Sequence, residues 1–487
     1  MSSPRLLGLL VIGCLLAPAT LGQGNFSVPA PRTASAAAAT ARKALDEGDL
    51  PAAAAALATL LDLDAGTLIE LPEDPGREST GSSAEPWVGA AVWARQQLDR
   101  APAELGELMA SSRESLAVKE LQRSTAFEAG RSTAARKRAL EGLLQRYPGT
   151  RAALEAGLML GDLAFEAGDP RKARAAWSAT ANAGRTSAYD DLASALERRL
   201  AVELPTEPPP RLPTLPPQLE GSWTFELPFT SREGYIDYSD LYPVAAEGRV
   251  FVNSGLRVLA LRASNGRLLW DSGEPLGWDA LSGWKRREMS RGIGREDLVN
   301  AVATDGRVVV APQQLPYSNS ENDQVDGLTI TVSLPERRLF AFDAVSGAPL
   351  WNHAPDAARR LLGLPLEFQQ RARISAPPKI VGDLVLVPSY ELVGRINLYV
   401  SAYDLFTGEL VWSQLVVSGQ TRVNLFGEHE VEFNSAPLAT TEDAVFVATG
   451  LGVVACLDRT TGEPRWTQDY SRFKLPRTNG YYTPRTG

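Results

Sequence analysis

The stretch AYDLFTGELVW, Ala402 to Trp412, decides the fold because its spacing recurs along the chain. A glycine stands six residues after the first alanine, and a tryptophan stands four residues after the glycine. Three further segments share this spacing without gaps: ALRASNGRLLW (260–270), AFDAVSGAPLW (341–351) and CLDRTTGEPRW (456–466). Self-similarity at a fixed internal spacing is typical of proteins built from one repeated supersecondary unit. The four copies therefore predict a repeated β-structure over residues 220–487.

Each copy is expected to be a β-hairpin closed by a tight turn. β-branched runs precede the copies and predict strands; they are GRVFV from Gly248, GRVVV from Gly306, GDLVLV from Gly382 and DAVFVA from Asp443. The turn requires a glycine with positive φ, which a preceding Thr, Ser or Asn favours. The tryptophan then begins the outer strand. The small residue at the first position is expected to leave room for an indole from a neighbouring unit.

The residues assigned to this docking pattern hold the turn and connect neighbouring units. They are Gly266, Trp270, Asp343, Gly347, Trp351, Asp404, Gly408, Trp412, Asp458, Gly462 and Trp466. The aspartates are expected to accept hydrogen bonds from the turn backbone. The first copy has Arg262 in place of aspartate and Asn265 in place of Ser or Thr, so its turn is expected to be less rigid. Cys456 replaces alanine in the fourth copy, and a buried packing role is favoured over a reactive thiol.

The pattern resembles the A-x-D-x-x-T-G-x-x-x-W docking motif of the PQQ-like β-propeller family, over roughly residues 221–472. The resemblance implies four-stranded sheets arranged as propeller blades and two alternative functions. Quinoprotein dehydrogenases of this family hold pyrroloquinoline quinone (PQQ) and Ca²⁺ at the centre of the ring. Non-enzymatic scaffolds, typified by the lipoprotein of the outer-membrane β-barrel assembly machinery, bind protein partners. The larger enzymes have an adjacent cysteine pair, which this chain lacks because its two cysteines are Cys14 and Cys456.

The sequence offers no catalytic residue. Its two histidines, His353 and His429, and its two cysteines are too few for the usual tetrahedral metal site. No G-x-S-x-G elbow and no phosphate-binding glycine loop is present. We therefore expect no cofactor, with PQQ and Ca²⁺ entering only under the dehydrogenase alternative. A formal charge of −9 disfavours a nucleic-acid partner.

Residues 1–22 are interpreted as an export signal. Arg5 precedes an apolar run from Leu6 to Leu16, and Ala17-Pro18-Ala19 follows it. This is the layout of a signal peptide, and the run is too short to span a bilayer. A second interpretation makes Cys14 the lipidated first residue of a lipoprotein. We expect a protein of the periplasm or cell envelope, attached to the outer membrane only if Cys14 is lipidated.

Residues 35–200 are predicted to form an array of helical hairpins, because strong helix formers dominate them. In the clearest unit, Leu158 to Trp177, Gly168-Asp169-Pro170 separates two helices, and Ala173 and Trp177 share a face. This spacing resembles the tetratricopeptide repeat, and a generic helical bundle is the alternative. Residues 203–218 contain seven prolines and predict a semi-rigid polyproline linker between two domains.

Two insertions between the copies are candidate surfaces. Residues 271–300 contain Trp278, Trp284, Arg286 and Arg287, a composition favoured at protein interfaces. The alternative for this insertion is a short amphipathic helix that covers a sheet face. Residues 315–336 include the polar run SNSENDQVDG and are predicted to be a solvated loop rather than a Ca²⁺ site.

The sequence thus predicts an α + β multidomain protein, with a tetratricopeptide-like helical array followed by an all-β PQQ-like propeller with four blades present. Because four blades are few for this family, we expect a longer protein in which the ring continues. The segment Gly221 to Phe225 is expected to be an outer strand of another blade. The predicted function is an exported, non-catalytic scaffold for proteins of the cell envelope. The alternative is a PQQ-dependent dehydrogenase whose catalytic part lies beyond residue 487.

Overall fold

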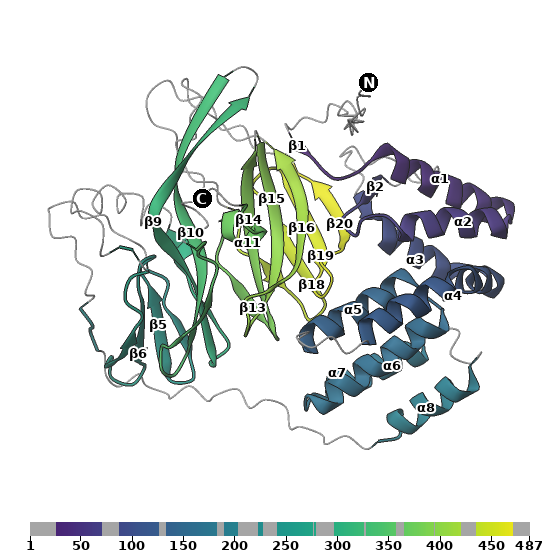
Figure 1. Cartoon of the computed structure of the whole chain (residues 1–487), viewed down its shortest axis with the longest axis horizontal. Coiled ribbons are helices and arrows are strands. Elements are labelled where there is room, and N and C mark those ends of the chain that lie inside the picture. Colours follow the sequence, from purple (N-terminus) through teal and green to yellow (C-terminus); the bar gives the residue numbers. More distant parts are fainter. Residues whose placement is uncertain are drawn as a thin grey trace, which may run out of the picture.

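The computed structural model describes residues 26–70, 87–125, 133–182, 189–202, 223–226, 241–275, 277–278, 297–325, 328–356, 365–393, 395–419 and 435–470. Within these ranges the chain combines a helical region with four antiparallel sheets (Figure 1). The predicted signal peptide and Cys14, and the linker at 203–218, lie outside the described residues. No described helix is both long and apolar enough to cross a membrane.

The helical region consists of consecutive helices, most of which pack against the next helix in sequence. They are α1 (Arg32–Glu47), α2 (Leu50–Leu61), α3 (Ala90–Arg100), α4 (Ala103–Thr125), α5 (Thr133–Arg146), α6 (Arg151–Glu166), α7 (Pro170–Ala181) and α8 (Asp190–Leu200). Asp169 begins α7 by accepting a hydrogen bond from the Lys172 amide, as an N-cap residue does. A Cβ on Gly161 would lie 2.1 Å from the Trp177 indole, so only glycine allows α6 and α7 to pack this closely.

The four sheets follow one another along the chain. Sheet 1 contains β4 (Val244–Ala246), β5 (Arg249–Asn253), β6 (Val258–Arg262) and β7 (Leu268–Asp271); sheet 2 contains β8 (Ala303–Thr304), β9 (Val308–Val325), β10 (Leu328–Asp343) and β11 (Pro349–Asn352). Sheet 3 contains β12 (Arg373–Ile374), β13 (Lys379–Val381), β14 (Leu384–Val393), β15 (Arg395–Asp404) and β16 (Leu410–Gly419); sheet 4 contains β17 (Ala439–Thr440), β18 (Ala444–Ala448), β19 (Val453–Asp458) and β20 (Pro464–Asp469). Two short helices, η2 (Asp297–Asn300) and α11 (Phe368–Arg371), lie between strands.

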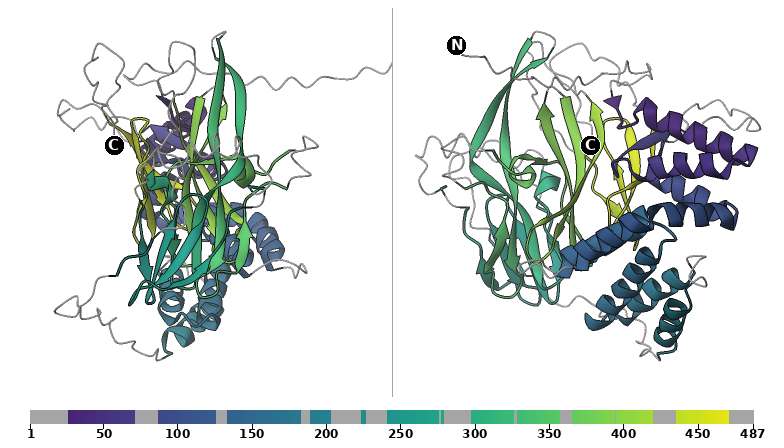
Figure 2. Two further views of the ribbon diagram at one scale, coloured as in Figure 1. Left: turned by 90° about the vertical axis from the view of Figure 1, so that its left-hand side faces the viewer. Right: turned by 45° about the vertical axis from the view of Figure 1, so that its right-hand side comes forward.

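The sheets stack side by side, and each pair of neighbours encloses a hydrophobic core (Figures 1 and 2). Phe251 of sheet 1 and Phe342 of sheet 2 belong to the first of these cores. Val310 and Val385 belong to the second, between sheets 2 and 3. The third core, between sheets 3 and 4, contains Trp412. Burial between the sheets, and not disulfide bonding, therefore holds this part of the chain together.

The insertion at residues 315–336 is not the solvated loop predicted from the sequence. It continues β9 and β10 into a long antiparallel hairpin, with Leu328 opposite Val325 at its end. Polar composition argued against strands because Ser, Asn and Asp have low β-propensity. The buried halves of both strands fix the register, however, and the pairing continues outward from them.

Three short strands from the helical region extend sheets 3 and 4 at their outer edges. β1 (Phe26–Ser27) pairs with β16, and β3 (Trp87–Gly89) pairs with β20 and with β2 (Leu68–Glu70). The helical region and the sheets are therefore joined by backbone hydrogen bonds as well as by the linker. Strands of two or three residues have no readable periodicity, so the sequence did not predict this pairing.

Candidate functional site

Each docking tryptophan lies over the glycine of the next copy. A Cβ on Gly347, Gly408 or Gly462 would lie about 2.5 Å from the indole of Trp270, Trp351 or Trp412, respectively. Each indole Nε1 also donates a hydrogen bond to a carbonyl oxygen in that turn; the acceptors are Ala344 at 3.1 Å, Leu405 at 2.9 Å and Arg459 at 3.0 Å. One indole thus fixes both the position and the orientation of the neighbouring turn.

A fourth indole docks in the same way ahead of the first copy. Trp223 covers Gly266, and its Nε1 donates to the Ala263 carbonyl at 2.8 Å. The sequence-based list of docking residues did not include Trp223. Residues 223–226 lie in no strand of the part of the chain that the structure describes, so the outer strand of another blade expected over Gly221 to Phe225 stays a prediction. A tryptophan near the start of the repeated region was the signal available in the sequence.

The turns have the geometry expected from their sequence. Gly408 has φ +72°, a left-handed conformation that glycine adopts without steric cost. Asp343 Oδ1 accepts hydrogen bonds of 2.7 Å from both the amide and the hydroxyl of Ser346. These bonds lower the pKa of Asp343, because they stabilise the carboxylate form. Asp404 and Asp458 bind the backbone of their own turns in the same manner.

The small residue of each copy has a different role from the one predicted. Ala402 pairs across the hairpin with Trp412 of its own copy, and not with an indole from another unit. The neighbour's indole instead occupies the space above the glycine of the turn. A large apolar residue, an alanine or cysteine, and a tryptophan therefore form a row across each sheet; the rows are Phe251-Ala260-Trp270, Val310-Ala341-Trp351, Leu386-Ala402-Trp412 and Phe446-Cys456-Trp466.

The fourth row, Phe446-Cys456-Trp466, differs from the other three because it does not face a neighbouring sheet among the described residues. Members of the first three rows lie in the cores between neighbouring sheets, and Phe251, Val310 and Leu386 are 0% exposed. Phe446 is only partly buried, whereas Trp466 is partly buried as Trp351 of the second row is. The rings of Phe446 and Trp466 contact each other with centroids 6.3 Å apart. Cys456 lies between them and is buried, and burial raises the pKa of its thiol. Among the described residues, no further sheet covers this face of sheet 4.

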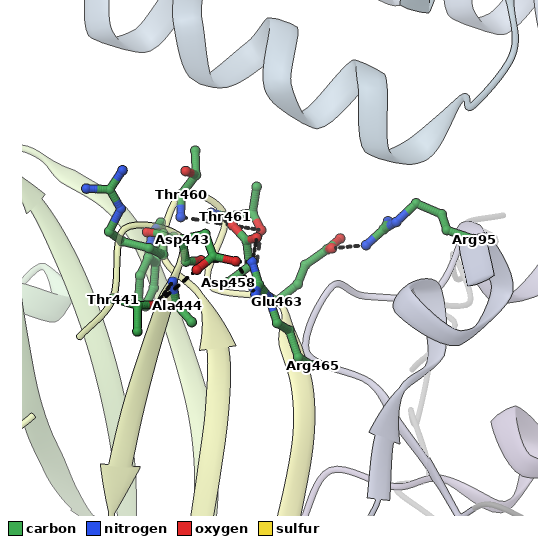
Figure 3. Close-up of polar contacts among 11 residues, drawn as sticks. Arg95, Thr441, Asp443, Ala444, Asp458, Thr460, Thr461, Glu463 and Arg465 are labelled. Carbon is green, nitrogen blue, oxygen red and sulfur yellow. Dashed lines mark hydrogen bonds and ion pairs between the residues drawn. The ribbon is translucent and has the colours of Figure 1, made fainter. Parts of the chain in front are cut away.

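A groove of about 410 Å³ lies between α3 and the fourth row. Its lining residues are Val92, Arg95, Gln96, Asp458, Glu463, Arg465 and Trp466. Arg95 of α3 forms an ion pair of 2.6 Å with Glu463, and Figure 3 shows this pair reaching across from the helix to the turn. Arg465 binds Asp443 at 2.7 Å and Asp458 at 2.9 Å. The arginines are thus held in place beside an aromatic side chain.

Residues 397–476 match a family model described as outer membrane protein assembly factor BamB, PQQ_2. The matched segment contains two of the four copies, 402–412 and 456–466, so the match supports the PQQ-like resemblance for these two copies. Two of the similar solved structures are quinohemoprotein alcohol dehydrogenases: one from Pseudomonas putida HK5 (17% identity, TM-score 0.28, 46% of this chain and 33% of that one) and one from Comamonas testosteroni (16%, 0.28, 46% and 34%). A europium-containing methanol dehydrogenase is similar at 13% identity and a TM-score of 0.27, over 47% of this chain and 41% of that one. This chain therefore spans well under half the length of these enzymes. No curated protein matches it.

A buried ionic cluster lies between sheets 2 and 3. Glu336 is 2.6 Å from Arg338 and 3.0 Å from Arg373, and all three side chains are at most 4% exposed. Burial opposes ionisation of Glu336, but the two arginine charges outweigh it and lower the pKa of the carboxyl group. No pattern in the sequence predicted this cluster, although PERR at 335–338 is an unusual run inside a strand.

The cavity beside this cluster is too small for a quinone cofactor. It has a volume of about 10 Å³ and is lined by residues that include Arg338, His353, Ser389 and Tyr403. That volume accommodates at most one water molecule. Arginine side chains could bind the anionic groups of a quinone. The cavity is nevertheless too small to hold PQQ, so the described residues at this position do not fit the cofactor. No group of three metal-ligating residues occurs among them either.

His353 is expected to make the stability of the protein depend on pH. Its Nε2 lies 2.8 Å from the Gly408 carbonyl, its ring stacks on Trp351, and burial lowers its pKa to about 4. Since the unfolded chain titrates near pH 6.5, folding favours neutral His353 and stability falls as pH drops from about 6.5 to 4. We expect a loss of at most about 3 kcal/mol in this window. Urea unfolding across the window should show a flatter profile for His353→Gln; an identical slope would contradict the assignment.

The predicted interface residues are only partly described. Trp278 is 0% exposed, and its Nε1 donates to the Gln314 carbonyl at 2.9 Å. It is therefore an interior anchor and not the exposed interface residue predicted for it. Trp284, Arg286 and Arg287 lie outside the described residues, as does His429.

Proposed function

We propose that this chain is an exported, non-catalytic scaffold that binds proteins in the cell envelope. In this proposal the four sheets are blades of a PQQ-like propeller, and the helices are a tetratricopeptide-like array attached to its rim. The groove between α3 and Trp466 is the observation that carries the proposal, because it combines a partly buried tryptophan in its wall with two positioned arginines. Trp and Arg are the residue types that contribute most binding energy at protein interfaces.

The arrangement of the groove supports binding rather than chemistry. Its walls come from two regions that are far apart in sequence, and the Arg95–Glu463 pair and the β3–β20 pairing connect them. A site whose walls are fixed before binding loses less conformational entropy when a partner is bound. The family match to an outer-membrane assembly factor agrees with a partner in the envelope.

Photo-crosslinking tests this proposal in the full chain. A photoreactive amino acid at Gln96, an exposed residue on the groove wall, should give a discrete crosslinked envelope protein. The same amino acid at exposed Lys43 on α1 is the matched control and should give none. Trp466→Ala should remove the Gln96 product. Equal products from both positions would contradict a binding role for the groove.

The dehydrogenase alternative is tested separately with PQQ and Ca²⁺. The purified chain is titrated with both, and dye-linked alcohol oxidation is measured. We expect no saturable binding and no turnover. Saturable binding with alcohol-dependent dye reduction would overturn the scaffold proposal.

A further inference from the structure

The turn between β19 and β20 forms part of the groove wall and is held by two helices. This turn, residues 458–463, is called the fourth-copy turn. One nitrogen of the Arg95 guanidinium on α3 lies 2.6 Å from the Glu463 carboxylate of the turn (Figure 3), and the other donates to the Gln145 carbonyl of α5 at 3.2 Å. Because one side chain joins α3, α5 and the turn, a shift of α5 would change the shape of the groove.

Glu141 lies on α5, one helical turn before the contact with α3. Its side chain is partly buried, and charged groups from three elements act on its carboxyl group. They are Lys137 of α5 itself, Asp383 of the turn before β14, and Asp458 and Arg459 of the fourth-copy turn. Burial is the largest influence, and together with the two aspartates it outweighs the two cations and raises the pKa of Glu141 to about 7.

Further elements pack around α5. Its apolar face packs against α4 and α6, and α4 also brings Arg113 to within 3.4 Å of the last carbonyl of α5. Arg138 of α5 donates to a carbonyl of the third copy at 3.4 Å, and Lys172 of α7 lies beside Gly382. Side chains thus attach α5 to the turns of sheets 3 and 4, and an ionised Glu141 adds a third carboxylate to the two aspartates at this contact.

We propose that Glu141 is a protonation switch for the groove: its neutral form keeps α5 and α3 attached to the fourth-copy turn, and its ionisation releases them. The proposal rests on the scaffold function and names the regulation of its site. An ionised carboxylate is unfavourable in a partly dehydrated contact beside two other carboxylates, and it regains its hydration when α5 moves away. A change in one charge can in this way alter how packed elements are arranged.

The direction of the pH effect follows from the two titrations of Glu141. Its carboxyl group titrates near pH 4.5 when it is free of this contact and near pH 7 when α5 is attached. Neutral Glu141 therefore stabilises the attached state fully below about pH 4.5, and this contribution is lost as the pH rises through about 7. Between about pH 5.5 and about pH 8.5 we expect the equilibrium constant for detachment to rise at least about ten-fold.

Hydrogen exchange of the full chain tests the switch without a known partner. Mass spectrometry follows the backbone amides of the fourth-copy turn and of β3, which pairs with β20, at about pH 5.5 and about pH 8.5. The variant is Glu141→Gln, which has the shape of the neutral side chain and does not titrate. Because wild type and variant contain the same amides, the ratio of their rates cancels the intrinsic pH dependence of exchange. This ratio should rise at least about ten-fold over the interval.

Two further variants separate a switch from a structural role. Glu47→Gln on α1, whose side chain is 61% exposed, is the matched control and should exchange like wild type at both pH values. Asp383→Asn removes one of the charges that raise the pKa of Glu141, so the pH dependence of exchange should move to lower pH. Circular dichroism checks that each variant is folded. An exchange ratio for Glu141→Gln that does not change with pH overturns the proposal.

The outcome is separable from that of the scaffold proposal, because exchange needs no partner and the Gln96 crosslink does. If the exchange ratio rises but Gln96 gives no discrete product at either pH, the scaffold proposal falls and control of attachment by Glu141 stands. If the product forms equally at both pH values and the exchange ratio is constant, only the switch falls. A crosslink yield that stays constant while the exchange ratio rises would show that detachment does not alter the groove, and would also overturn the inference.

Discussion

Replacing Trp412 by alanine should lower the free energy of unfolding by about 3–5 kcal/mol. The indole is 9% exposed, belongs to the core between sheets 3 and 4, and donates a 3.0 Å hydrogen bond to the Arg459 carbonyl. Its removal leaves a cavity above Gly462 and an acceptor without its donor. Urea unfolding followed by circular dichroism measures the loss.

The control for this prediction is Phe406→Ala in the turn of the same copy. Phe406 is aromatic but 49% exposed, and its ring contacts the Arg307 guanidinium at 5.2 Å, so its replacement should cost no more than about 1 kcal/mol. Equal destabilisation by both substitutions would show that Trp412 does not join sheets 3 and 4.

Replacing Glu336 by glutamine should cost about 3–5 kcal/mol, although the two side chains have nearly the same shape. The substitution leaves Arg338 and Arg373, both nearly fully buried, without a negative charge between them. The cost arises because the two buried guanidinium groups then lose the negative charge that compensates for their lost hydration. Thermal unfolding should show a correspondingly lower Tm.

Asp443→Asn is the matched control for Glu336. Asp443 also binds an arginine, at 2.7 Å, but its side chain is 69% exposed, so its loss should cost no more than about 1 kcal/mol.

Unfolding in acid provides an independent test of the Glu336 cluster. The pKa of Glu336 is lower in the folded protein than in the unfolded chain. Ionised Glu336 therefore contributes to the free energy of unfolding above the unfolded pKa, and this contribution is lost as the pH falls through the folded pKa. A wild-type Tm for Glu336→Gln would contradict the buried cluster.

The sequence determined the repeated unit because the determinants of a hairpin turn are local. The glycine at position 408, the aspartate at 404 and the tryptophan at 412 stand close together in the chain, and each acts within its turn or on an adjacent one. The hairpins, their turn hydrogen bonds and most of the helices could therefore be predicted. Family membership of residues 397–476 followed from the same spacing.

Only the tertiary structure decided what the repeats contact. The pairing of β3 with β20 joins residues about 380 positions apart, and the Glu336 cluster and the groove beside α3 likewise depend on contacts between distant segments. No local pattern encodes such contacts, because their energy comes from burial and charge compensation after the chain has folded. For the same reason Trp278 changed from a surface candidate to an interior anchor, and the partly buried Trp466 became part of a groove wall beside α3.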